Sequence, residues 1–482
     1  MIAPLLSAIL LALATMLPWG APLTLVALVP LLSALRHPAP RWTGWKLGYL
    51  FGLVYGFAQL AWIFSLTAKW TESAVLALVP YLLAVALFAI YFGLFGWLSR
   101  KLFEADRAWA IPFLWAGVEV FRSYIPVFAF PWGLLATPWH VLPFAMKPAA
   151  IGTIYAVSAL AAWINLAIAF RSSRMGTTAA VTAGLAMIPC QPAATRQIDV
   201  AVVQPGVDMA YGDPRLIEGK LGLAIDRQLA SIIGTDLIVL PEGIARGGSH
   251  LPPQTPFRVP RSAILFGGHR GSGPYFQSAF AWDGRVWRVI DKTRLVIFGE
   301  FVPGRDLFPF LQAFKLPAGD LTAGTEGVKS LPFSFGEVGP ILCFEALFPD
   351  IAARQSANGA QLLAVMSIDD WFMGTNAPEQ LRAAAAWRAV ENQMPVLRAG
   401  TMGRSEIVEA SGRVLEDGGY GSPKVLRARV GLPAQKSPPW LLTLFPLLAV
   451  GVSLLIPWLP RRGRRSSDTP GSDPTLESAA PL

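Results

Sequence analysis

Three residues whose chemistry is complementary each follow an apolar run of the kind that forms a buried strand. Glu242 stands two residues after Leu237–Leu240, Lys292 stands two residues after Val286–Ile290, and Cys343 directly follows Pro340–Leu342. In layered α/β proteins such strand ends commonly meet at one edge of a sheet, where ligands bind. We therefore expect a carboxylate, an ammonium group and a thiol to converge.

This set of side chains suits acyl transfer. A thiol is the nucleophile of the set, but its free pKa of about 8.5 means that it needs a base. No histidine occupies a comparable position, so the carboxylate of Glu242 is the expected base, with a pKa that burial would raise. Lys292 can stabilise a developing oxyanion. Taken singly, Cys343 is more often a buried structural cysteine, and Glu242 or Lys292 a solvated loop charge.

The segment that must position these residues, 191–437, reads as one α/β domain. Short apolar runs separated by turns predict strands at Ile198–Val203, Leu237–Leu240, Ala263–Phe266, Phe276–Trp282, Val286–Ile290, Ile341–Cys343, Leu362–Met366, Val396–Ala399 and Ile407–Ala410. Helical patterns lie at Arg215–Ile233, Pro349–Asn358 and Pro378–Asn392. Apolar strands mixed with helices indicate a layered domain with a largely buried sheet.

The remainder of the chain is too apolar for a soluble protein. Of the 482 residues, 53% are hydrophobic and 15% are charged, against about 25% charged in soluble domains. The excess lies in residues 1–190 and in one late run, which indicates a membrane protein with a large extramembrane domain. The two cysteines, Cys190 and Cys343, and the four histidines show no metal-ligand spacing, so neither a metal nor another cofactor is expected.

Apolar segments that approach the roughly 20 residues of a membrane-spanning helix predict about eight spans. They are Ile2–Leu17, Ala21–Leu35, Leu47–Leu66, Ala74–Leu98, Trp109–Tyr124, Ala149–Phe170, Thr177–Cys190 and Trp440–Leu459. We thus divide the chain into a transmembrane domain at 1–190 with seven spans, the α/β domain at 191–437, a last span at 438–460 and a basic, disordered tail at 461–482.

The net charge is +9, and the basic residues cluster between the apolar runs and after the last one. This distribution indicates membrane topology and not a nucleic-acid-binding patch. If the N-terminus is cytoplasmic, the inward loops hold most of the basic residues between the spans, and the outward loops hold only Lys69 and Lys147, with Arg122 at the edge of a span. The inward set is Arg36, Arg41, Lys46, Arg100, Lys101, Arg107, Arg171, Arg174, Arg461, Arg462, Arg464 and Arg465. The positive-inside rule then places residues 191–437 outside, in a bacterium the periplasm.

Two further features lie near the outer membrane surface. Glu119 and Arg122, spaced i, i+3, are expected to pair; a snorkelling arginine with a carboxylate partner is an equally good interpretation. Aromatic residues in Phe130-Pro131-Trp132-Gly133 fit an interfacial belt, or the lining of a lipid path. The apolar stretch Phe301–Leu316, which includes Phe308, is predicted to dip into the outer leaflet and admit acyl chains, the alternative being an arm folded onto its own domain.

At the three strand ends the sequence resembles the nitrilase, or carbon-nitrogen hydrolase, superfamily. The motifs are Leu240-Pro241-Glu242, Lys292 followed by Phe298-Gly299-Glu300-Phe301-Val302-Pro303, and Cys343-Phe344-Glu345. With the flanking spans, nearly the whole chain is similar to the apolipoprotein N-acyltransferase family. The resemblance implies eight spans, an αββα sandwich in the periplasm of the bacterial inner membrane, and transfer of an acyl chain from a phospholipid to the N-terminal amine of a diacylglyceryl-cysteine lipoprotein.

The resemblance also assigns roles residue by residue. Glu242 would be the general base, Lys292 the oxyanion stabiliser and Cys343 the nucleophile that forms a thioester, with Glu300 and Glu345 in support. The residues expected to contact substrate or lipid are Trp132, Trp371, Phe372, Phe308 and Arg398. Phospholipid and lipoprotein are the expected partners, and the chain is expected to act as a monomer.

Other functions stay open at this point. Ile368, Leu381 and Thr401 stand where the family has Asn, His and Asn, so the acceptor differs if those polar groups matter. A membrane-tethered amidase that uses water, or a paralogue with another acceptor, would keep the same three residues. A transporter or assembly factor with a degenerate domain is a third class.

Overall fold

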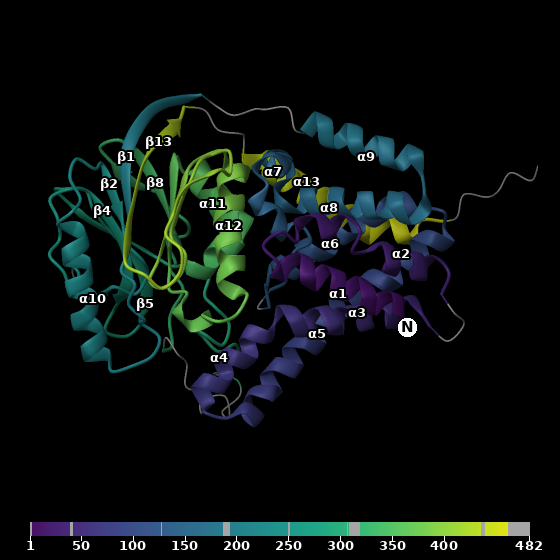
Figure 1. Cartoon of the computed structure of the whole chain (residues 1–482), viewed down its shortest axis with the longest axis horizontal. Helices are drawn as coiled ribbons and strands as arrows, with labels where there is room; N and C mark the ends of the chain where they lie inside the picture. Colours follow the sequence, from purple (N-terminus) through teal and green to yellow (C-terminus); the bar gives the residue numbers. More distant parts are fainter. Residues whose placement is uncertain are drawn as a thin grey trace, which may run out of the picture.

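The computed structural model describes residues 2–38, 42–126, 128–186, 193–248, 251–305, 307, 319–434 and 439–460. Helices from the two ends of the chain pack together, and the strands between them form a sandwich beside the helices (Figure 1). We call these the helical part and the sandwich.

The helical part contains α1 (Ile2–Met16), η1 (Ala21–Leu25), α2 (Val29–Arg36), α3 (Gly44–Gln59), α4 (Ala61–Thr71), α5 (Ala74–Glu104), η2 (Ala108–Ala110), α6 (Ile111–Tyr124), η3 (Thr137–Val141), α7 (Pro143–Met146), α8 (Ala149–Phe170), α9 (Ser173–Ala186), α13 (Pro439–Leu455) and η7 (Ile456–Trp458). Glycines at every fourth position of α3 let it lie directly on α5. A Cβ on Gly48 would stand 2.0 Å from the carbonyl oxygen of Phe92, so this contact requires glycine.

All eight apolar segments predicted as spans lie largely in these helices, but few of them are long enough to cross a membrane alone. Among the described residues, α5 and α8 meet both the length and the hydropathy of a span, and α3 with α4 makes a third if a 50° bend is allowed. The predicted span Leu47–Leu66 corresponds to this bent pair. At the bend, the indole N–H of Trp132 donates to the carbonyl of Gln59, 3.0 Å away.

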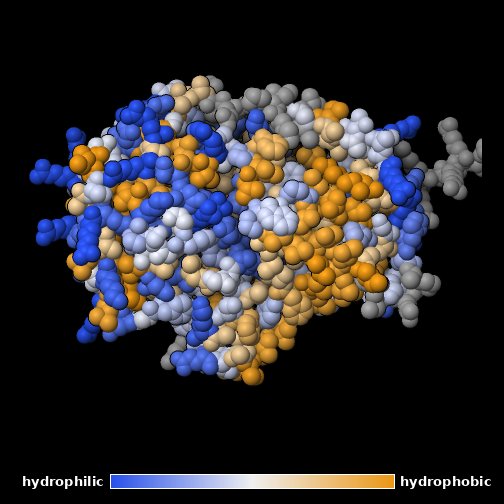
Figure 2. Space-filling view, viewed as in Figure 1, coloured by the Kyte–Doolittle hydropathy of each residue, from blue (hydrophilic) through white to orange (hydrophobic). Residues whose placement is uncertain are grey.

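The surface of the helical part is apolar over a broad band (Figure 2). Large exposed side chains on α5 and α13, among them Val79, Leu83, Leu447 and Leu454, contribute to the apolar surface of this part of the molecule. Such an area exceeds what a soluble monomer leaves in water, and it fits lipid contact.

The sandwich is built from two mixed sheets. Its strands are β1 (Ala194–Gln204), β2 (Leu237–Val239), β3 (Ala245–Gly247), β4 (Ile264–Arg270), β5 (Phe276–Trp282), β6 (Trp287–Asp291), β7 (Leu331–Phe333), β8 (Gly336–Leu342), β9 (Leu362–Ser367), β10 (Val396–Gly400), β11 (Glu406–Val408), β12 (Val414–Asp417) and β13 (Lys424–Pro433). The first sheet has the order β13-β1-β2-β4-β5-β6, with β3 on β4, and the second has the order β12-β11-β10-β9-β8-β7. Each has parallel strands at its centre and antiparallel strands at its edges.

Apolar side chains from both sheets meet in a closed core. Val200 and Val239 of the first sheet and Val338, Ala364 and Leu397 of the second belong to it. Helix α10 (Pro214–Leu229) covers the outer face of the first sheet, and α11 (Pro349–Ala357) and α12 (Ala377–Asn392) cover the second. The layers are therefore α, β, β, α.

Helix α12 joins the sandwich to the helical part. It lies between the second sheet and the membrane-type helices, and nearly all of its residues are buried (Figure 1). Its Gln380 bonds to Gln59 of α3 and to the backbone of Gly133, and its Glu391 accepts the N–H of Ile154, where α8 departs from helical geometry. Alanines on α12 allow the close approach, and Glu391 accepts a backbone N–H at the kink in α8.

Candidate active site

The three predicted residues follow strands whose ends face each other across the sandwich. Glu242 follows β2, Lys292 follows β6 and Cys343 follows β8. Strands β2 and β6 run in the same direction in the first sheet, because β4 is parallel to β2 and two antiparallel pairings lead from β4 to β6. The sheet topology therefore brings both charged residues to one edge, as the sequence predicted.

Lys292 lies between two carboxylates. Its Nζ is 2.6 Å from Glu300 Oε1 and 3.4 Å from Glu242 Oε1. Glu300 is fixed in turn, because its other oxygen accepts the backbone N–H of Val296 at 2.8 Å. The backbone N–H of Lys292 donates to the carbonyl of Gln277 on β5 at 2.8 Å. The ammonium group is thus held in place and still has a third hydrogen to donate.

Burial and charge act in opposite directions on this pair. Burial raises the pKa of Glu242 above the usual value, the charge of Lys292 lowers it in part, and the charge of Glu300 raises it again. Burial lowers the pKa of Lys292, but Glu242 and Glu300 outweigh that effect and leave it above the usual value. A carboxylate of raised pKa is a stronger base, and a permanently charged lysine is suited to an oxyanion.

Cys343 sits at a sharp turn from strand to helix. It is the first residue of η5 (Cys343–Leu347), and its φ of 49° lies in the left-handed region that a side chain rarely adopts. Burial and, to a smaller extent, the charge of Glu242 raise the pKa of its thiol, the charge of Lys292 lowers it, and the net pKa is about 12. The resting group is therefore a thiol, and its reaction requires transfer of its proton.

Two buried charged residues hold the turn that carries Cys343. Glu345 accepts the N–H groups of Thr293 and Arg294, at 2.9 and 3.0 Å, with one oxygen, and that of Leu342 at 3.1 Å with the other. It therefore ties the segment after Lys292 to the strand before Cys343. Arg388 of α12 donates to the carbonyls of Ala346 and Leu347, at 2.9 and 3.0 Å. Strain at φ 49° persists only where the surroundings over-determine it in this way.

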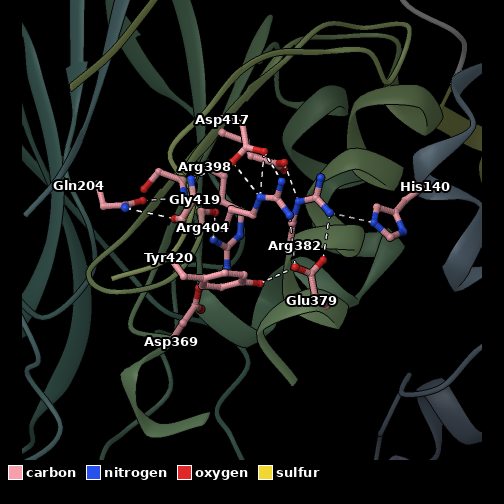
Figure 3. Close-up of polar contacts among 12 residues, drawn as sticks. His140, Gln204, Asp369, Glu379, Arg382, Arg398, Arg404, Asp417, Gly419 and Tyr420 are labelled. Carbon is pink, nitrogen blue, oxygen red and sulfur yellow. Dashed lines mark hydrogen bonds and ion pairs between the residues drawn. The ribbon is translucent and has the colours of Figure 1, made fainter. Parts of the chain in front are cut away.

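Strand β9, beside β8, brings two residues that the sequence prediction did not include. Ser367 Oγ lies 3.4 Å from Cys343 Sγ and 2.6 Å from Asp369 Oδ1. Asp369 binds Arg398 at 2.6 Å, and Figure 3 shows this pair beside Arg404 and Tyr420. The signal was present in the sequence, because these residues end the apolar run Leu362–Met366 as Cys343 ends its own strand.

The residues predicted to contact substrate have different surroundings in the structure. Trp132 and Phe372 pack against Trp62 of α4, with ring centroids 5.2 Å away in both cases, and Trp132 also stacks on Phe344, next to the nucleophile. Trp371 is half-buried against Trp70 and Tyr211.

Arg398 needs a correction: it is fully buried and bound to Asp369 and the carbonyl of Arg404, so it supports the site from behind and does not face substrate. Phe308, and most of the stretch Phe301–Leu316 with it, lies outside the described residues.

Glu119 and Arg122 form no direct ion pair in the part of the chain that the structure describes, which corrects the expected pairing. Both hold the Phe130–Gly133 loop instead. Arg122 donates to the carbonyl of Trp132, and Glu119 accepts the N–H of Leu135 at 2.7 Å. The loop packs on Phe344, so these buried charges support the wall of the candidate site from within the helical part.

The three residues that differ from the family pattern have separate surroundings. Ile368 lies against the backbone after Glu242, because a Cβ on Gly243 would stand 2.4 Å from its Cδ1. Leu381 is buried in α12. Thr401 donates to Asp370, which also accepts the N–H groups of Met209 and Met402. Only Ile368 adjoins the predicted base.

Among the described residues, no three His, Cys, Asp or Glu side chains are grouped as metal ligands would be.

Comparison with known proteins agrees with this arrangement. The family model described as the apolipoprotein N-acyltransferase N-terminal domain matches residues 7–167, and that of carbon-nitrogen hydrolase matches residues 285–434. The chain is 28% identical to the apolipoprotein N-acyltransferase of Geobacter metallireducens, with 85% of each chain covered. It is also 28% identical to that of Pseudomonas putida, with 94% of this chain and 95% of the other covered.

Among solved structures, a carbon-nitrogen hydrolase from Helicobacter pylori is 17% identical, with a TM-score of 0.36 over 49% of this chain and 89% of that one. Saccharomyces cerevisiae Nit3, a member of branch 10 of the nitrilase superfamily, is 17% identical, with a TM-score of 0.38 over 54% of this chain and 96% of that one.

The carbon-nitrogen hydrolase match and the four-layered sandwich together define a nitrilase-like enzyme with an added helical part. Two further findings distinguish the chain within the nitrilase-like enzymes. The helical part matches its own family model, and the relatives align over most of the chain. Over most of its length, the chain is similar to the apolipoprotein N-acyltransferases.

Proposed function

We propose that this protein is a lipoprotein N-acyltransferase: it takes an acyl chain from a phospholipid, holds it as a thioester on Cys343, and passes it to the N-terminal amine of a diacylglyceryl-cysteine lipoprotein. The observation that carries the proposal is the position of Glu242 and Lys292 at one edge of the first sheet, with Cys343 facing them from the end of β8 in the second sheet, beside an apolar helical part. The names of the full-length relatives support the acceptor class.

In the first half-reaction, Glu242 accepts the thiol proton and Sγ attacks the ester carbonyl of the phospholipid. Lys292 donates a hydrogen bond to the oxygen that becomes negative. The tetrahedral intermediate then breaks its bond to the glycerol oxygen, which takes the proton from Glu242 and leaves as a lysophospholipid. The acyl chain remains on Cys343.

In the second half-reaction, the neutral amine of the lipoprotein attacks the thioester carbonyl. Glu242 accepts a proton from the attacking nitrogen, and Lys292 again stabilises the oxyanion. When the intermediate collapses, the bond to Sγ breaks and the proton returns from Glu242 to sulfur. The free thiol and an amide are formed, and the roles of all three residues are restored.

The location of the site fits a lipid donor. Phe344 stacks on Trp132 and Phe130 of the helical part, with centroids 6.2 and 6.0 Å away, so the nucleophile lies directly beside the membrane-type helices. We propose that the helices form about eight spans in a bacterial inner membrane, with the sandwich in the periplasm and the chain acting as a monomer. The inward bias of basic residues supports this orientation.

Intact-mass spectrometry tests the proposal. Purified protein mixed with phospholipid vesicles but no acceptor should gain the mass of one acyl chain, and Cys343→Ser, whose hydroxyl is a far weaker nucleophile, should give no turnover and gain nothing within the same time. Addition of a diacylglyceryl-cysteine peptide should discharge the adduct onto the peptide amine. A folded protein that never gains an acyl group would contradict the proposal.

The same experiment separates the amidase alternative. If the acyl-enzyme forms but releases free fatty acid at equal rates with and without the peptide, water is the acceptor and the protein is a hydrolase. A paralogue with another amine acceptor would form the adduct and keep it in the presence of the lipoprotein peptide.

A further inference from the structure

Ser367 is the only described residue that forms a hydrogen-bond contact with the sulfur of Cys343. It is the last residue of β9 and is buried, and its Oγ lies 3.4 Å from Sγ. The same oxygen lies 2.6 Å from Asp369 Oδ1. A serine hydroxyl has one hydrogen and two lone pairs, so it can donate to only one of these neighbours at a time.

Asp369 is the stronger acceptor of the two. Its second oxygen is bound to Arg398 Nη2 at 2.6 Å, and both side chains are fully buried. Arg398 keeps its charge, and it is oriented by a further bond to the carbonyl of Arg404. Figure 3 shows Asp369 at the end of this group, with Arg404, Glu379 and Arg382 beyond it. A short bond to a charged carboxylate is stronger than a 3.4 Å contact to sulfur.

The hydroxyl of Ser367 is within donor distance of both Cys343 Sγ and Asp369 Oδ1. Because the contact with Asp369 is shorter and its acceptor is charged, we assign the hydroxyl hydrogen to Asp369, which leaves a lone pair of the serine oxygen facing the sulfur. We propose that Ser367 is a positioning residue for the nucleophile: it accepts the thiol hydrogen of Cys343 in the resting enzyme and holds that hydrogen away from Glu242. The charged groups that face the thiol are Glu242 after β2, Lys292 after β6 and Asp369 after β9.

This arrangement gives a defined order to the first proton transfer. With Ser367 as its partner, the thiol stays protonated and resists alkylation and oxidation, which act on the thiolate. Bound substrate favours another rotamer of the Cys343 thiol, in which the S–H group points to Glu242 and no longer to Ser367. The thiol proton then moves from sulfur to the carboxylate of Glu242, which leaves a thiolate and a neutral carboxylic acid. The hydroxyl of Ser367 keeps its hydrogen and continues to donate a hydrogen bond to Asp369. No proton is gained or lost overall.

The inference deepens the proposed function, on which its catalytic meaning rests, but alkylation of the thiol tests it without any acyl transfer. Ser367→Ala removes the acceptor and nearly preserves the side-chain volume. We expect the pH midpoint of iodoacetamide alkylation at Cys343 to fall by about half to one unit. Because the thiolate fraction follows that shift, alkylation at pH 8 becomes about 3–10-fold faster.

Three variants complete the experiment. Ser367→Thr retains the hydroxyl and should restore the original midpoint. Ser405→Ala removes another buried hydroxyl, which bonds only to the backbone of Gly400 among the described residues, and should leave the midpoint unchanged. Ser367→Gly replaces the alanine variant if that protein does not fold, with the same expected shift. An unchanged midpoint, or one that rises because serine donates to the thiolate, would overturn the proposal. A shifted midpoint in a protein that never forms an acyl-enzyme would contradict the proposed function alone.

Discussion

At the scale of single residues, the balance between two carboxylates and one lysine determines how the site works. Lys292 faces Glu300 at 2.6 Å and Glu242 at 3.4 Å, so Glu300 takes the closer ion pair and Glu242 keeps part of its basicity. If Lys292 paired fully with Glu242, the base would be weaker. Glu300 thus has an electrostatic role in addition to holding the lysine.

This role predicts a change in pH dependence. Glu242 must be ionised to accept the thiol proton, so the acylation rate falls as the pH drops through the pKa of Glu242, which burial raises above the usual value of about 4.3. In Glu300→Gln a like charge is lost, the pKa of Glu242 falls, and the acid limb of the profile moves to lower pH. The maximal rate also falls, by roughly 10-fold, because a weaker base transfers the proton less readily.

Initial rates of Cys343 acylation between pH 4 and 8 would measure this shift. Glu242→Gln is the reference variant. Without its base, the enzyme should acylate about 10²–10⁴-fold more slowly, and its pH–rate profile should lack the acid limb that Glu242 causes. A limb that stays in place or moves to higher pH in Glu300→Gln would argue against an electrostatic role for Glu300.

At the scale of elements, the turn after β8 depends on groups that arrive from distant segments. Glu345 receives bonds from the segment after β6 and from the end of β8, and so it sets the distance between Lys292 and Cys343. Glu345→Gln replaces one acceptor oxygen by an NH₂ group that faces backbone N–H donors. We expect a loss of about 1–3 kcal/mol in the free energy of unfolding and a fall in turnover of about 100-fold, because reacting groups shift by a fraction of an ångström.

Thermal unfolding and turnover of this variant should be compared with those of Glu337→Gln. Glu337 lies on β8, the strand before Glu345, is half-buried, and accepts from Ser330 at 2.8 Å, away from the site. The control should keep near-normal turnover. Equal losses in the two variants would mean that Glu345 has no special role in placing Lys292 and Cys343.

The comparison of predicted and observed elements shows which patterns carry information. Apolar runs located the strands that precede the three site residues, and Phe276–Trp282 matches β5 at both ends. The last strand, β13, was missed because its buried residues, Leu426, Val430 and Leu432, alternate with arginine and glycine and so form no run.

Other features of the site could not be predicted, because they arise from contacts between distant segments. The burial of α12 on several faces depends on its position between two domains, and nothing in its own alanine-rich pattern specifies that position. The same holds for Arg398, which the resemblance placed in contact with substrate or lipid, whereas the structure shows it buried against Asp369. The site residues at strand ends were predictable from local pattern, and the supporting Glu300 and Glu345 from the resemblance. The contacts that Asp369 and Arg388 make with distant segments were not predictable.

At the scale of the whole molecule, basic side chains gather at the end of the helical part that lies away from the sandwich. Arg107 bonds to the last carbonyls after α13, including that of Leu459 at 2.8 Å, and Lys101 lies 3.4 Å from the ring centroid of Trp458. Arg100 bonds to the carbonyl of Arg36 at the end of α2. Figure 2 shows blue surface at this edge, an apolar band next to it and the more polar sandwich beyond.

A polar end, an apolar band and a polar domain in this order match a membrane that crosses the molecule at the band, with the basic end in the cytoplasm. This orientation predicts which positions an impermeant thiol reagent reaches in intact spheroplasts. With Cys190 and Cys343 replaced by alanine, Ile233→Cys, at a site 87% exposed beyond α10, should be labelled before lysis. Glu104→Cys, exposed at the end of α5 among the basic residues, should be labelled only after the membrane is permeabilised. The opposite order would place the sandwich in the cytoplasm, where it could not meet an exported lipoprotein, and the proposed acceptor would have to be abandoned even if the thioester forms.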